Sequence, residues 1–80
     1  MGKKYSKTIR FMTQQAVLNF YDKAVKFDGD IDVIIDKKIM DGKSLLGLMS
    51  LDLSREMLVV LDTDDENSAS ELIRHLDDLS

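Results

Sequence analysis

The sequence predicts an α+β fold, an open-faced β-sandwich in which three helices cover one face of a four-stranded antiparallel sheet, in the order β-α-β-β-α-β-α. Two segments show the period-two alternation of half-buried strands, and two longer ones repeat apolar residues at helical spacing. One continuous apolar run is bounded by polar residues. Helices on one side of an antiparallel sheet let each element bury its apolar face. We expect a single domain over residues 1–80, because so short a chain supports one core.

The first strand is expected at Tyr5–Phe11, where alternate side chains are apolar. A helical period begins after Thr13, whose hydroxyl suits an N-cap. The apolar face of this helix comprises Ala16, Val17, Phe20, Ala24 and Phe27. Asp28-Gly29 is expected to end the helix, because glycine tolerates left-handed backbone.

A hairpin, a short helix and a buried strand are expected in the middle of the chain. Strands at Asp30–Ile35 and Lys38–Met40 flank a turn at Asp36-Lys37, and the lysines there suit an exposed sheet edge. Lys43–Leu51 is apolar nearly all round, which predicts a short helix. The continuous run Met57–Leu61 predicts a central strand.

A last helix carries an apolar stripe of Ala69, Leu72, Ile73, Leu76 and Leu79. Thr63…Glu66 and Ser68…Glu71 both match a capping box, so its start is expected at one of two successive turns. His75, the only histidine of the chain, flanks the stripe. We expect it to be a solvated surface side chain.

The charge of the chain argues against nucleic-acid binding. The formal net charge is −4, and the basic residues are scattered apart from Lys3, Lys4 and Lys7. Nucleic-acid binding usually begins with a concentrated positive surface, and none is indicated here. Acidic residues gather at Asp28–Asp36 and Asp62–Glu66, and we expect both segments to be solvated surface.

Membrane insertion, export and catalysis are not indicated either. No apolar run approaches the roughly 20 residues that a membrane span needs, and Lys3-Lys4 is not followed by the apolar stretch of a signal peptide. We therefore expect a cytoplasmic protein. The chain has no cysteine, no metal-ligand cluster and no glycine-rich phosphate loop. We expect it to bind no cofactor and to be no enzyme.

Three segments of the chain are similar to segments of one known family. Lys43–Leu51 reads KSLLGLMSL. This segment resembles, almost residue for residue, the Lys-Ser-Ile-Met-Gly-Val-Met-Ser-Leu segment of HPr, the small phosphocarrier of the bacterial sugar phosphotransferase system. Lys26–Ile31 resembles the stretch that leaves the family's first helix, and Asp65–Asn67 resembles the start of its last helix. The element order is that of the family too, so the resemblance implies an HPr-like fold.

The same resemblance concerns the start of the first helix. In the family's phosphocarriers, a Gly-hydrophobic-His-Ala-Arg-Pro-Ala stretch opens this helix, and its histidine accepts the phosphate. The ungapped alignment places Phe11–Val17 there, with Thr13 at the histidine position and Gln15 at the arginine position. A hydroxyl without an adjacent base is a weak nucleophile. The resemblance therefore implies a variant without histidine phosphocarrier activity, similar to the family's catabolite-repression paralogue.

Ser44 stands where many Gram-positive relatives are phosphorylated by an ATP-dependent kinase. The modified family member then binds a transcriptional regulator. A phosphate of charge about −1.5 to −2 is favoured near the start of a helix. The alternative is that Ser44 is the N-cap of the short helix, a common role for serine. The two roles are compatible.

The candidate partner-binding residues are Leu45, Leu46 and Met49, together with Thr13 and Gln14. Contiguous exposed apolar side chains usually mark a partner site, and flexible methionine suits adaptable surfaces. We expect Leu45 and Met49 to be accessible.

These observations favour a regulatory or adaptor module that binds proteins through its second helix. The resemblance implies an HPr kinase and a transcriptional regulator as partners, with phosphorylation at Ser44 as the switch. One alternative is a phosphocarrier with an atypical acceptor such as Thr13. Another is an orphan structural domain that self-associates through its apolar helix. We expect a monomer or a weak homo-oligomer.

Overall fold

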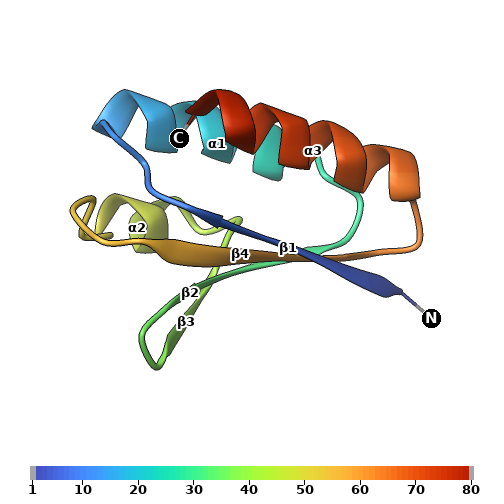
Figure 1. Cartoon of the computed structure of the whole chain (residues 1–80), viewed down its shortest axis with the longest axis horizontal. Helices are drawn as coiled ribbons and strands as arrows, with labels where there is room; N and C mark the ends of the chain where they lie inside the picture. Colours follow the sequence, from blue (N-terminus) through green and yellow to red (C-terminus); the bar gives the residue numbers. More distant parts are fainter. Residues whose placement is uncertain (1, 80) are drawn as a thin grey trace.

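The computed structural model describes residues 2–79, and Figure 1 shows two layers. Helices α1 and α3 lie over one face of the sheet, and α2 lies at one end of the molecule. Along the chain, the elements are β1 (Lys3–Ile9), α1 (Gln14–Ala24), β2 (Asp30–Ile35), β3 (Lys38–Asp41), α2 (Leu45–Met49), β4 (Met57–Thr63) and α3 (Glu66–Leu79). The predicted order and the four-stranded antiparallel sheet with three helices are confirmed. No helix within residues 2–79 has the length and apolar character that crossing a membrane requires.

The strand order of the sheet is β1-β4-β2-β3, so β4 has a strand on each side, as the apolar run predicts for a central strand. All three pairings are antiparallel. β2 and β3 form the predicted hairpin, closed at Asp36-Lys37. Asp36 has a φ of 54°, in the left-handed region that aspartate enters more readily than most residues. β3 is an edge strand, where charged side chains discourage pairing with other chains.

One hydrophobic core lies between the sheet and the helices. The sheet contributes alternate residues of its central strands, because side chains alternate between faces. The helices contribute one stripe each. The apolar residues predicted for the first helix are all buried, although the last of them lies beyond the end of α1: Ala16, Val17, Phe20, Ala24 and Phe27.

The first strand ends earlier than the alternation predicts. It stops at Ile9, so the predicted end at Phe11 is wrong. Phe11 is nevertheless fully buried, because the chain turns inward there and its ring packs against Phe20, with the ring centroids 5.4 Å apart. The sequence correctly assigns Phe11 to the core but not to the strand.

The first helix also ends earlier than predicted. It stops at Ala24, and a tighter turn follows, in which the backbone N–H of Phe27 donates to the carbonyl of Ala24 at 3.1 Å. Gly29 does not cap this helix, and its φ is 144°. A Cβ at this position would lie 2.3 Å from the Asp62 carbonyl oxygen. The glycine is required because the loop passes close to β4.

The last helix is capped by Asp65, which is neither of the two predicted N-caps, Thr63 and Ser68. The Asp65 carboxylate accepts hydrogen bonds from the backbone N–H groups of Asn67 at 3.0 Å and Ser68 at 3.2 Å. Both predicted caps are therefore wrong. Thr63 is instead the last residue of β4, where it is 5% exposed and donates a hydrogen bond to a distant part of the chain.

Candidate functional site

Ser44 lies directly before α2, where a compact turn positions it. The backbone N–H of Lys43 donates to the Asp41 carboxylate at 2.9 Å, and the N–H of Ser44 donates to the Asp41 carbonyl at 3.1 Å. The Ser44 hydroxyl accepts a hydrogen bond from the N–H of Gly47 at 3.3 Å. The N-cap role is therefore confirmed. The Lys43 side chain is also held in place, because its ammonium group donates a hydrogen bond to the carbonyl of Phe27 at 2.7 Å.

The helix that follows presents three apolar side chains to solvent. Leu46 is 86% exposed, Met49 is 43% exposed and Leu45 is 40% exposed. Leu48 is fully buried and attaches the helix to the core. We call Leu45, Leu46 and Met49 the α2 patch. A five-residue helix has room for one buried anchor, so the remaining apolar side chains face outward.

Thr13 occupies the N-cap of α1. Its hydroxyl accepts a hydrogen bond from the N–H of Ala16 at 3.1 Å, so the predicted N-cap is confirmed. Gln14 and Gln15 are exposed on the first turn. The Gln15 side-chain amide donates to the carbonyl oxygen of Asn19 at 3.0 Å. The Thr13 hydroxyl is thus engaged by the backbone of the helix that it caps.

The candidate residues of α1 and α2 lie at the same end of the molecule. The two helices pack against each other, and Figure 1 shows the start of α1 above α2. Met12, which precedes Thr13, is 68% exposed and adds a further apolar side chain at this end. The structure thus brings together the two segments that the sequence singled out.

His75 is not the solvated surface residue that the sequence predicts. It is half-buried, and its Nε2 atom is buried with no hydrogen-bond partner in the described chain. With Lys23, Lys26 and Phe27 it lines a hollow between α3 and the end of α1. Lys23 is ten positions after Thr13, which is about 15 Å along a helix axis. His75 is therefore remote from the start of α1. The periodicity of α3 did not predict its burial, because residues at and after the end of α1 lie beside it.

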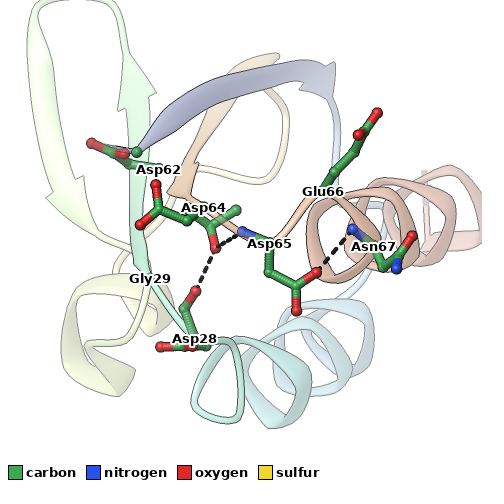
Figure 2. A pocket seen from close by; sticks show the side chains of 9 residues that line it. Asp28, Gly29, Asp62, Asp64, Asp65, Glu66 and Asn67 are labelled. Atoms are coloured by element: carbon green, nitrogen blue, oxygen red, sulfur yellow. Dashed lines mark hydrogen bonds between the residues drawn. The ribbon is translucent and has the colours of Figure 1, made fainter.

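A second hollow, of about 610 Å³, lies at the end of the molecule away from α2 and is acidic (Figure 2). The sequence assigns its segments to solvated surface, and Asp64, Asp65 and Glu66 are indeed exposed. Hydrogen bonds from Ser68, chiefly from its hydroxyl, hold the pKa of Asp65 below its ordinary value of 3.8. Within residues 2–79, no group of three or more potential ligands is arranged to hold a metal ion.

Comparison with known proteins agrees with this architecture. The family model of the PTS HPr component phosphorylation site matches residues 12–79. No individually curated protein matches the chain. The crystal structure of HPr-C-His from Thermoanaerobacter tengcongensis is 30% identical, with a TM-score of 0.64, and the match covers 96% of this chain and 89% of that one.

Two further solved structures share the fold. The phosphocarrier protein HPr from Bacillus anthracis is 22% identical, with a TM-score of 0.66 and coverage of 91% of this chain and 96% of that one. Crh, the catabolite repression HPr of Bacillus subtilis, is 23% identical, with a TM-score of 0.62 and coverage of 92% and 95%. Proteins of this family are phosphocarriers that interact with other proteins, and they are not enzymes. Because the family model spans most of the sequence and the Thermoanaerobacter relative matches nearly all of it, this chain belongs to the HPr family.

Proposed function

We propose that this HPr-family protein is a regulatory adaptor without histidine phosphocarrier activity, which binds proteins through the α2 patch and is switched by phosphorylation at Ser44. One observation carries the proposal. The serine that the resemblance marks as a kinase target lies immediately before three exposed apolar side chains. Apolar side chains gathered on a surface usually mark a protein contact.

Phosphorylation of Ser44 changes the charge beside the α2 patch. The Ser44 oxygen bonds to the γ-phosphorus of ATP, the bond to the β–γ bridging oxygen breaks, ADP leaves, and the hydroxyl proton passes to a base of the kinase. The product carries a charge of about −1.5 to −2 and new acceptor oxygens. The N–H of Gly47 already donates to this side chain, so it is placed to donate to the phosphate. A partner with a basic rim and an apolar centre then gains affinity.

The absence of carrier activity is argued from the start of α1. We propose that Thr13 occupies the family's histidine position. Its hydroxyl accepts a hydrogen bond from the backbone N–H of Ala16, and no imidazole lies beside it among the described residues. His75 lies by the far end of α1 and cannot replace the missing group there. The resemblance supplies the expected partners, an HPr kinase and a transcriptional regulator.

Mass spectrometry after incubation with two phosphate donors tests the switch. With ATP and an HPr kinase, we expect one acid-stable phosphoryl group, which is lost in Ser44→Asn. Asparagine is as good an N-cap as serine, so this variant keeps the helix start while removing the acceptor. With phosphoenolpyruvate and enzyme I, we expect no label. An acid-labile phosphate on His75, or a label abolished by Thr13→Ala, would establish a carrier and contradict the proposal.

Measuring the affinity of the phosphorylated protein for the transcriptional regulator tests the α2 patch. Leu46→Ser should weaken binding of the phosphorylated protein, whereas Val25→Ser should leave it unchanged. Val25 is the matched control, because it is a 43% exposed apolar residue at the end of α1. Equal binding by both variants would exclude the α2 patch. Concentration-dependent dimers that Leu46→Ser abolishes would favour the self-associating alternative.

A further inference from the structure

The face of the sheet opposite α1 and α3 is not covered by any element within residues 2–79 (Figure 1). Its side chains are the strand residues that alternate with the buried ones. We call this surface the open face. It comprises Lys4, Ser6 and Thr8 of β1, Leu58, Val60 and Asp62 of β4, Asp30, Asp32 and Ile34 of β2, and Ile39 and Asp41 of β3.

An apolar row crosses the open face. Ile34 is the register partner of Leu58 on β4 and of Ile39 on β3, so the three side chains stand side by side across three strands. Ile39 is 69% exposed, and the other two are half-buried. Thr8 continues the row onto β1, opposite Leu58. At a strand separation of about 4.8 Å, the row is about 14 Å long.

An acidic band lies beside the apolar row. Asp32 is directly opposite Asp41, and two residues further along the strands Asp30 is directly opposite Asp62. Like charges directly opposite each other on one face destabilise a sheet. Lys4 is opposite Asp62, on the outer side of this band. The open face therefore holds four carboxylates against one ammonium group, at a cost in stability that a bound cationic partner would relieve.

We infer that the open face is a second docking surface, and that its occupant is a basic amphipathic helix of a partner protein. A helix is about 10 Å wide, so one that lies along the apolar row covers it with its apolar stripe. Asp32 and Asp41 lie about 7 Å from the row, within reach of lysine or arginine side chains on the flank of that helix. A second copy of this chain is disfavoured, because two open faces would set carboxylates against carboxylates. This surface is distinct from the α2 patch and does not depend on Ser44.

Methyl and amide NMR titration of the labelled full chain tests the inference. The probe is a lysine–leucine amphipathic helical peptide, and the control is the same peptide with glutamate in place of lysine. We expect shift changes at Ile34, Ile39, Leu58 and Val60 with the basic peptide only, and weaker binding as salt screens the charges. Shifts centred on the α2 patch, or equal binding of both peptides, would overturn the inference.

Charge-neutralising variants separate docking from structure. Asp32→Asn should lower the affinity for the basic peptide about two- to fivefold, the range expected for one exposed charge pair. The same variant should raise the Tm, because it removes the repulsion from Asp41. Asp22→Asn makes the same change of charge on the exposed surface of α1 and should leave the affinity unchanged. An equal loss of affinity in both variants would show that only the net charge matters and would refute a docking site on the open face.

Discussion

The hydroxyl of Thr63 donates a hydrogen bond of 2.7 Å to the carbonyl oxygen of Asp28, 35 residues earlier in the chain (Figure 2). The hydroxyl oxygen of Thr63 also accepts a hydrogen bond from the backbone N–H of Asp65 at 3.1 Å. One side chain thus joins the loop before β2 to the loop before α3. Since Thr63 is 5% exposed, water cannot readily replace these bonds.

Replacing Thr63 by valine should lower the free energy of unfolding by about 1–3 kcal/mol, because the carbonyl of Asp28 and the N–H of Asp65 lose a buried partner. Urea denaturation followed by circular dichroism measures the change. Thr8→Val is the matched control, since Thr8 is exposed on β1 and valine suits a strand. A Thr63 variant as stable as the control would show that the two bonds contribute nothing net.

Replacing Gly29 by alanine should destabilise the protein by about 1–3 kcal/mol. The residue has a φ of 144°, and a Cβ would lie 2.3 Å from the carbonyl oxygen of Asp62. Gly47→Ala is the control, because its new Cβ would meet the flexible end of Met40 at 3.3 Å while alanine favours the helix. Thermal melts should separate the two variants. Equal Tm values would mean that the Gly29 loop relaxes freely.

Phe11 and Met12 are neighbours in sequence with opposite environments. Phe11 is fully buried against Phe20, so Phe11→Ala should cost about 3–5 kcal/mol. Met12 is 68% exposed, and Met12→Ala should change the stability by less than about 0.5 kcal/mol. Chemical denaturation of both variants checks the difference. Similar losses would indicate that Phe11 leaves the core in solution.

The carboxylate of Asp65 should make the start of α3 sensitive to acid. Its pKa lies below 3.8, chiefly because the Ser68 hydroxyl donates to it at 2.9 Å. A lowered folded-state pKa contributes stability that is present above 3.8 and is lost as the pH falls through the folded-state value. Asp65→Asn keeps a good N-cap but cannot titrate. Its Tm should therefore fall less than that of the wild type between neutral pH and about pH 3.

Ser68→Ala tests the cause of this shift. Removing the hydroxyl that donates to Asp65 should reduce the acid dependence of the Tm while leaving the carboxyl able to titrate. The helix start keeps the backbone hydrogen bonds to Asp65 in this variant. If the Tm of both variants fell with acid as much as that of the wild type, other carboxyl groups would govern acid unfolding.

The sequence predicted some features of the candidate site correctly and missed others. The capping roles of Thr13 and Ser44 follow from a polar residue placed just before an apolar helical period. The expected accessibility of Leu45 and Met49 is confirmed, because a helix this short cannot bury every face, but the sequence did not single out Leu46 as the most exposed of the three. His75 was misjudged, because one helix's periodicity does not show what a second helix covers. The cap at Asp65 was missed for a related reason, since the loop's path decides which of several polar residues reaches the helix start.

The sequence by itself determined the element types, their order and the buried faces, because these follow from periodicities over a few neighbouring residues. Only the tertiary structure decided the strand order β1-β4-β2-β3 and the register, which depend on pairings between residues distant along the chain. That register sets Ile34 beside Leu58 and Ile39, and it sets Asp32 opposite Asp41. The open face is therefore a product of strand pairing, and no local pattern could have revealed it.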